Sequence, residues 1–259
     1  MHTRSSVQTW LSQGKHQVLS LFLAEPCPLC QRSTPAVLCP SCSRQVHQCQ
    51  AQTPCDRSIP GLAVVSWGRY EGSLRQAIGS LKYSNHPRLA EFLGTELGQT
   101  WLDRGPCPKD LARPVAIVPI PLHPSRLQQR GFNQAELLAQ WFCRLTRLPL
   151  HSNGLLRVQA TQAQHSLSRL SRQQNLAQAF TVNPSQVKIL KQSTVWLLDD
   201  IFTTGATAQA AAQTLRRNGI AVGGICTVAR AVAWADSDSY SPSNLDPGID
   251  VSDRILRKN

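Results

Sequence analysis

The sequence lacks any uninterrupted apolar run of about 18 residues, the length that a membrane-spanning helix needs. We therefore expect no membrane span. A shorter apolar stretch, residues 18–24, is similar to the core of a secretory signal peptide, but Glu25-Pro26-Cys27 follows it instead of the small residues of a cleavage site. We expect an amphipathic helix here and a cytoplasmic location. The apolar face of this helix would carry Trp10, Leu11, Val18, Leu21 and Phe22.

Acidic residues are scarce, with 15 Asp and Glu against 27 Lys and Arg, so the formal net charge is +12. None lies between Glu136 and Asp199. The basic residues of that acid-free segment are Arg144, Arg147, Arg157, Arg169, Arg172, Lys188 and Lys191. This excess favours polyanionic partners, either nucleic acid or a phosphate-rich small molecule. A solvated basic face without a partner is the alternative.

The sequence has no internal repeat, and it divides into three parts by composition. Residues 1–60 hold six of the nine cysteines and show little apolar periodicity, which predicts an N-terminal helix and a small module without a hydrophobic core of its own. Residues 61–235 carry regular apolar patterns. Residues 236–259 contain Ser, Asp and Pro without periodicity, which is typical of a disordered tail.

The central part alternates strand patterns with helix patterns. Short apolar or β-branched runs predict strands at residues 62–70, 115–121, 195–200 and 220–230. Apolar residues spaced three and four apart predict helices at residues 73–83, 88–102, 132–148 and 206–219. This alternation predicts an α/β domain around a mostly parallel sheet flanked by helices.

Two Cys-x-x-Cys pairs lie close together in the N-terminal module. They are Cys27 with Cys30 and Cys39 with Cys42. Two such turns supply four thiolates to a tetrahedral Zn²⁺, and a site filled by cysteine alone is structural rather than catalytic. Disulfide pairing and a redox role are the alternatives, and a cytosolic compartment disfavours the first.

The other cysteines do not form such pairs. Cys49 and Cys55 are interpreted as spare thiols, with a remnant of a second metal site as the alternative. Cys107, Cys143 and Cys226 are isolated, and we expect the last two to be buried as small apolar residues.

The segment VWLLDDIFTTGAT, residues 195–207, combines a buried strand, an acidic pair and the start of a helix. Such a junction exposes backbone N–H groups and the positive helix end, which together bind phosphate. Asp199 and Asp200 suit the hydroxyls of a ribose, and one of them could help to hold Mg²⁺ through water. The phosphate contacts would come from Thr203, Thr204, Gly205, Ala206 and Thr207. A buried strand that ends in a polar turn is the alternative.

This segment resembles the motif by which type I phosphoribosyltransferases bind 5-phosphoribosyl-1-pyrophosphate (PRPP). The chain is further similar to the ComF/GntX family, in which a four-cysteine zinc module precedes such a domain. The similar segments are residues 80–83, 118–139, 157–180 and 195–207. With the cysteines, the resemblance covers about residues 20–232 and implies a type I phosphoribosyltransferase-like fold.

The resemblance implies ligand contacts outside this motif. The loop Pro121–Arg130 would grip the pyrophosphate, and Arg126 and Arg130 could present guanidinium groups to one polyphosphate. Residues 157–180 would be the mobile hood that closes over the substrate. Lys82 would add a further phosphate contact, and the hood residues that would point at the ligand are Arg157, Gln164, Arg172 and Asn175. Solvated arginines and a surface loop are the alternatives, and His123 is interpreted as a hydrogen-bonding turn residue.

The implied reaction is ribosyl transfer at C1 of PRPP, with Mg²⁺-pyrophosphate as the leaving group. Asp199 and Asp200 would hold the ribose, and Arg126 and Arg130 would neutralise the pyrophosphate. The acceptor stays open, because no aromatic cluster marks a base pocket. The resemblance also implies non-catalytic alternatives: a part in DNA uptake during natural competence, with single-stranded DNA or other competence proteins as partners, or PRPP sensing.

Overall fold

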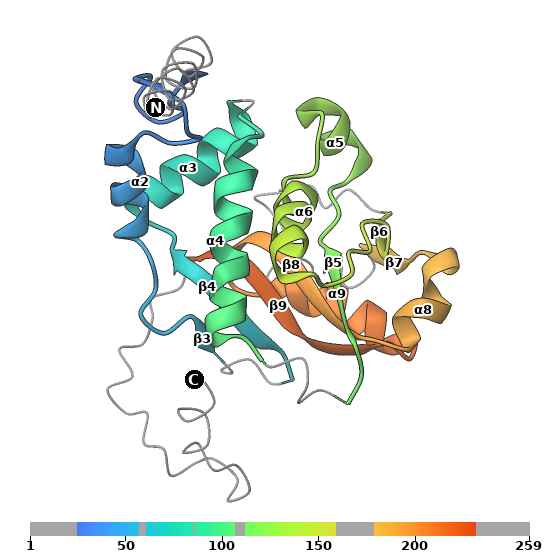
Figure 1. Cartoon of the computed structure of the whole chain (residues 1–259). Coiled ribbons are helices and arrows are strands. Elements are labelled where there is room, and N and C mark those ends of the chain that lie inside the picture. The colour runs from blue at the N-terminus through green and yellow to red at the C-terminus, as the bar shows by residue number, and fades with distance from the viewer. Residues whose placement is uncertain (1–24, 57–60, 85, 107–111, 159–178, 232–259) are drawn as a thin grey trace, which may run out of the picture.

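A five-stranded sheet forms the centre of the molecule. The computed structural model describes residues 25–56, 61–84, 86–106, 112–158 and 179–231 (Figure 1). The sheet comprises β3 (Cys55–Asp56), β4 (Ala63–Arg69), β5 (Val115–Pro119), β8 (Thr194–Phe202) and β9 (Ala221–Arg230). Its strand order is β3-β4-β9-β8-β5, and every neighbouring pair is parallel except β3 with β4. The predicted α/β class with a mostly parallel sheet is therefore confirmed.

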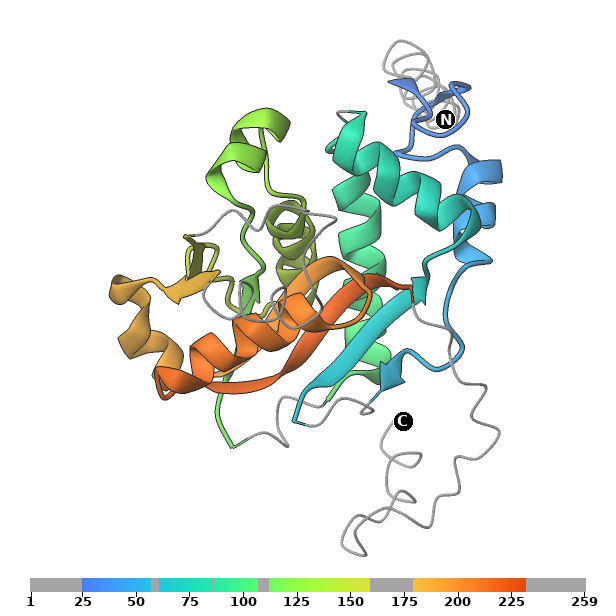
Figure 2. The same ribbon diagram turned by 180° about the vertical axis from the view of Figure 1, so that it is seen from behind.

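Helices cover both faces of this sheet, as Figures 1 and 2 show. One face packs against α4 (Leu89–Arg104) and α6 (Gln134–Thr146), and the other packs against α9 (Ala206–Arg217). Trp196 and Leu198 of β8 belong to the first core, while Val195 and Leu197 of this strand face the second. The four strand predictions and the four helix predictions are confirmed. Strands that are buried on both faces need apolar runs, and helices that cover a sheet on one side need apolar residues spaced three and four apart.

The N-terminal module packs directly against this domain. It contains the short strands β1 (Glu25–Pro26) and β2 (Ser33–Thr34), followed by α2 (Pro40–His47), which contacts α3 (Gly72–Tyr83). Cys27, Leu38 and Val46 are buried in the same core as α3 and α4. The division after residue 60 stays a prediction, and the module shares a core and, through β3, a sheet with the residues that follow.

Two glycines on β9 make room for a tryptophan of the neighbouring strand. A Cβ atom at Gly223 or Gly224 would meet the indole of Trp196, and at Gly224 it would also meet the carbonyl oxygen of Ala63. The Trp196 ring packs edge-on against Trp101 of α4, with 4.7 Å between ring centroids. These glycines therefore serve packing within the sheet.

Four short elements lie beside the α9 face of the sheet. The strands β6 (Leu155–Arg157) and β7 (Phe180–Val182) form an antiparallel pair, and the short helices η2 (Pro184–Gln186) and α8 (Val187–Lys191) follow them. Several predictions fall outside the described residues: the helix with Trp10, Leu11, Val18, Leu21 and Phe22, the hood residues Gln164, Arg172 and Asn175, Cys107, and the tail 236–259. Across the described part of the chain, no helix combines the length and the apolar character needed to span a bilayer.

Candidate functional site

Four cysteine thiols meet in the N-terminal module. The Sγ atoms of Cys27, Cys30, Cys39 and Cys42 all lie within 4.8 Å of one another. A tetrahedral Zn²⁺ with Zn–S bonds of about 2.3 Å requires sulfur–sulfur separations of about 3.8 Å. Cys30 Sγ and Cys39 Sγ are 3.5 Å apart, so the cluster needs little adjustment around such an ion. The four residues grouped by their spacing in the sequence therefore come together and can hold a metal ion such as zinc.

The backbone of the module positions these thiols. Gln31 takes a left-handed conformation with a φ of 63°, and the backbone N–H of Cys27 donates to the carbonyl oxygen of Arg32 at 2.8 Å. Cys39 lies at the N-cap of α2, and its own N–H points at Cys27 Sγ at 3.5 Å. Hydrogen bonds from the backbone and the guanidinium of Arg32 lower the pKa of Cys30, which favours the thiolate that a metal ion requires.

The other described cysteines lie apart from this cluster. The thiol of Cys49 is buried against the carbonyl oxygen of Glu71, and that of Cys55 donates to the carbonyl oxygen of Arg104 at 3.0 Å. Neither joins a second group of metal ligands among the residues that the structure describes. Cys143 and Cys226 are buried, as predicted.

The acidic pair lies at the carboxyl end of β8. This strand extends to Phe202, so Asp199 and Asp200 are strand residues, as predicted. Because the side chains of a strand alternate, the two carboxylates differ in environment: Asp200 is fully buried, whereas Asp199 is mostly buried and keeps some exposure. Asp199 Oδ1 accepts a hydrogen bond from the backbone N–H of Asp200 at 2.8 Å.

The loop after β8 has the geometry expected of a strand-to-helix junction. Gly205 takes a φ of 76°, in the left-handed region that favours glycine, and α9 begins at Ala206. Thr203 and Thr204 are exposed, and the Ala206 N–H donates to Thr204 Oγ1 at 3.4 Å. Thr207 lies in the first turn of α9. Phosphate binding by this loop stays a prediction.

Lys82 reaches the acidic pair from the last turn of α3. Its Nζ lies 2.8 Å from Asp200 Oδ2, and the two side chains keep only 16% and 5% of their exposure. The sequence assigned Lys82 to a phosphate and Asp200 to a ribose, and the structure pairs the two with each other. A ligand that approaches the Asp200 carboxylate therefore competes with an ammonium group that already neutralises it.

The neighbouring carboxyl group resists ionisation. Burial, followed by the charge of Asp200, raises the pKa of Asp199, while Lys82 and Arg157 act in the opposite direction. Arg157, on β6, has its own pKa lowered by burial and by the charge of Arg126, with Asp199 opposing the shift. Arg157 and Asp199 therefore act on each other electrostatically, and Arg126 acts on Arg157.

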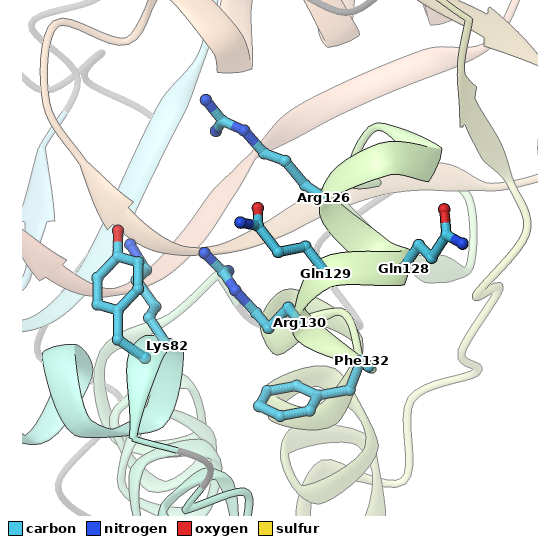
Figure 3. A pocket seen from close by; sticks show the side chains of 8 residues that line it. Lys82, Arg126, Gln128, Gln129, Arg130 and Phe132 are labelled. Carbon is cyan, nitrogen blue, oxygen red and sulfur yellow. The ribbon is translucent and has the colours of Figure 1, made fainter.

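A pocket of about 830 Å³ opens beside Lys82. Its lining consists of Lys82, Tyr83, Arg126, Gln128, Gln129, Arg130, Gly131 and Phe132. Figure 3 shows Arg126, Gln129 and Arg130 on the side that faces Lys82, while Gln128 points away. The lining is thus cationic and amide-rich, which suits an anionic or strongly hydrogen-bonding ligand.

Half of this lining comes from a helix where the sequence indicated a loop. Residues Pro124–Arg130 form α5, which has no buried side chain and therefore no apolar periodicity to predict it. His123 caps this helix, since its Nδ1 accepts from the Ser125 N–H at 3.3 Å, which confirms its interpretation as a turn residue. Helical spacing places Arg126 and Arg130 on one side of α5.

Arg130 is held in place by two contacts. Its guanidinium donates to the side-chain oxygen of the buried Gln134 in α6, and it lies over the ring of Tyr83 with 5.4 Å between Cζ and the ring centroid. Asn133 caps α6 and donates to the carbonyl oxygen of Ile120 at 3.1 Å. These bonds hold the end of α5 against the end of β5, and they fix the position of Arg130 in the pocket lining.

The structure brings together most of the described residues that the sequence singled out. Lys82, Asp199, Asp200, Arg126, Arg130 and Arg157 are linked by an ion pair, by charge effects or by the shared pocket. Arg172 falls outside the described residues. The sequence missed Tyr83 and Phe132 as lining residues, whereas Gln128 and Gln129 lie within the loop Pro121–Arg130 that the resemblance assigned to the pyrophosphate. For Tyr83 a signal was present, because it directly follows Lys82 at the end of a predicted helix.

Comparison with known proteins finds relatives over most of the chain. It is 33% identical over 202 residues to DNA utilization protein YhgH of Escherichia coli strain K12, an alignment that covers 75% of this chain and 86% of that protein. The corresponding Salmonella typhimurium protein is 32% identical over 201 residues, with the same coverage. Competence protein F of Haemophilus influenzae is 39% identical over 110 residues, which cover 42% of this chain and 48% of that protein. No protein-family model matches the chain.

Proposed function

This chain belongs to the ComF/GntX family, and we propose that it serves DNA utilisation during natural competence through a site that binds PRPP. The names of its relatives, DNA utilization protein and competence protein, support the first part of this proposal. The second part rests on the geometry of the site. The role in DNA utilisation and the binding of PRPP are separate proposals, because one fold supports many activities.

The observation that carries the PRPP proposal is the convergence of three elements. The acidic pair at the end of β8 leads through Gly205 into α9, and Lys82 of α3 pairs with Asp200 and lines one pocket with Arg126 and Arg130 of α5. Ribose hydroxyls would donate to the carboxylates, and the N–H groups of residues 203–207 would bind the 5-phosphate. Arg126 and Arg130 would bind the pyrophosphate.

Two metal ions belong to the proposal. Zn²⁺ would hold Cys27, Cys30, Cys39 and Cys42 together as a structural site, since four thiolates leave no open position for chemistry. Mg²⁺ would accompany PRPP, because carboxylate and phosphate oxygens are the ligands that it prefers. When bound, Mg²⁺ would neutralise part of the pyrophosphate charge. Asp199 is the better placed carboxylate for it, as Lys82 occupies Asp200.

The chemistry we propose is displacement at C1 of PRPP. An acceptor nucleophile would form a bond to C1 as the bond from C1 to the pyrophosphate oxygen breaks, and pyrophosphate would leave with the electron pair. Arg126 and Arg130 would stabilise the charge on the leaving group, and the acidic pair would hold the ribose in position. Binding of PRPP as a signal, without transfer, is the alternative that uses the same residues.

A second candidate function is binding of single-stranded DNA. The net charge of +12 favours a polyanion, and the names of the relatives point to DNA. Other competence proteins are further candidate partners. We also propose the division into residues 1–60, 61–235 and 236–259 and a cytoplasmic location, both from the sequence.

Calorimetric titration with PRPP and Mg²⁺ tests the central proposal. The wild-type protein should bind, and the double variant Asp199→Asn/Asp200→Asn should lose most of its affinity. The exposed Asp103→Asn on α4 makes the same chemical change away from the site and should bind as the wild type does. No heat of binding in the wild type would refute PRPP as the ligand.

Two further measurements separate the candidates. Release of pyrophosphate in the presence of candidate bases distinguishes an enzyme from a binder. Single-stranded DNA binding that weakens steeply with added salt would support phosphate contacts, whereas no binding at low salt would remove the nucleic-acid proposal.

A further inference from the structure

Tyr83 is an aromatic residue whose side chain does not pack into the hydrophobic core. It keeps 79% of its exposure, more than any other large apolar side chain among the described residues. The other large apolar residues of α3, Leu74, Ile78 and Leu81, are fully buried. Packing therefore explains those three positions and leaves Tyr83, at the end of the helix, without a structural reason to be aromatic.

The surroundings of this ring are cationic. Lys82, the preceding residue, is fixed to Asp200, and Arg130 lies over the Tyr83 ring at 5.4 Å. Arg130 is itself bound to the buried Gln134, so it supports the ring rather than moving freely. The exposure of Tyr83 leaves much of the ring accessible at the wall of the 830 Å³ pocket.

We propose that Tyr83, supported by Arg130, is the stacking surface for a planar heterocyclic base at the mouth of this pocket. Every nucleobase has a π face that stacks on tyrosine regardless of sequence, and arginine adds a cation–π contribution. The side-chain amide of Gln129, on the Lys82 side of α5, can bond to the polar edge of a base (Figure 3). The phosphates of the same ligand would lie towards Arg126.

This inference rests on the proposed PRPP site, and it names the class of the missing acceptor. A free nucleobase would stack on Tyr83 next to the ribose and accept it. A base of single-stranded DNA would present the same chemistry with its own backbone attached. Ligand pockets of about 300–1,000 Å³ hold molecules of this size, and the pocket falls in that range.

Fluorescence of 2-aminopurine tests the stacking, because this base loses emission when it stacks on an aromatic ring. Two probes are needed: free 2-aminopurine with Mg²⁺ and pyrophosphate, and an oligothymidylate that carries one 2-aminopurine. The wild type should quench at least one probe, and quenching by the free base or by the strand identifies the source of the base. Tyr83→Phe keeps the ring and should retain quenching.

Tyr83→Ala should bind the quenched probe about tenfold more weakly. Leu102→Ala, which removes another exposed apolar side chain on α4, should behave as the wild type does. No quenching of either probe by the wild type, or equal quenching by Tyr83→Ala, would overturn the inference. The PRPP titration of the wild type reports on the proposed function separately, so the two failures are distinguishable.

Discussion

Lys82 and Asp200 form a buried ion pair between α3 and β8, with 2.8 Å from Nζ to Oδ2. The pair joins the helix next to the cysteine module to the strand that leads into the proposed phosphate loop. Both side chains are largely withdrawn from water, so neither charge is well solvated without the other. The ion pair therefore couples the stability of the fold to the electrostatics of the site.

Removing the lysine should destabilise the protein. Lys82→Met leaves the Asp200 carboxylate buried without its partner, and we expect the free energy of unfolding to fall by about 3 kcal/mol. The double variant Lys82→Met/Asp200→Asn removes both charges and should recover most of that loss. Urea denaturation of the four members of this double-mutant cycle measures the coupling.

The control for this cycle is Lys188→Met. Lys188 is an exposed lysine on α8, so the same substitution there should change the unfolding free energy by less than about 0.5 kcal/mol. If Lys82→Met is as mild as Lys188→Met, the ion pair does not contribute to stability.

The pKa of Asp199 predicts how stability depends on pH. Because burial and the Asp200 charge raise this pKa, the folded protein keeps a proton that the unfolded carboxyl group releases. The contribution of Asp199 to stability is therefore complete below the ordinary carboxyl range and is lost as pH rises through the raised pKa. Asp199→Asn cannot release a proton. Its free energy of unfolding should therefore rise relative to that of the wild type by about 1 kcal/mol or more as the pH increases from about 4 to about 9.

Urea denaturation of the wild type and of Asp199→Asn across this pH range tests the direction of the change in unfolding free energy. Asp103→Asn, at an exposed position on α4, should follow the wild type. A wild type that gains stability relative to Asp199→Asn as pH rises would contradict the raised pKa. Binding of Mg²⁺ and PRPP should have the opposite trend and strengthen with pH, because the ligand needs the ionised carboxylate.

The sequence predicted the central sheet because burial leaves a clear pattern. β5 and β8 are covered on both faces, so each contains an apolar run that is typical of a buried parallel strand. The short strands were not predictable in this way. β3 has two residues and β6 has three, and their place depends on contacts with β4 and β7 rather than on local composition.

The same reasoning explains what was predicted of the candidate site. The four cysteines and the acidic pair carry their chemistry in their spacing, whether or not the fold is known. The pairing of Lys82 with Asp200 joins residues far apart in the sequence, and Tyr83 gains its meaning only from Arg130 on another helix. Relationships of this kind follow from tertiary structure and leave no periodic signal.

Loss of one cysteine ligand should release the metal and weaken the whole domain. Cys42→Ser leaves three thiolates, and we expect bound zinc to fall from about one equivalent to a small fraction of it. Because Cys27, Leu38 and Val46 pack into the same core as α3 and α4, the thermal unfolding midpoint of the chain should also fall. Metal analysis and thermal denaturation measure the two effects.

Cys55→Ser provides the matched control. Cys55 is exposed and lies outside the cluster, so this variant should keep about one equivalent of zinc. Full zinc content in Cys42→Ser, or equal loss in both variants, would contradict a four-cysteine site.

Glycine at position 224 is required by the packing of Trp196. A Cβ atom there would collide with the indole ring and with the carbonyl oxygen of Ala63, which belongs to the parallel neighbour β4. Neither the backbone of a central strand nor a buried indole can move away easily, so Gly224→Ala should lower the unfolding free energy by about 3 kcal/mol.

Gly79→Ala makes the same substitution within α3, where a Cβ atom would meet nothing within 4 Å. Since alanine favours a helix over glycine, Gly79→Ala should instead stabilise the protein by about 0.5–1 kcal/mol, and urea denaturation that gives both variants the same sign would contradict this account of Gly224.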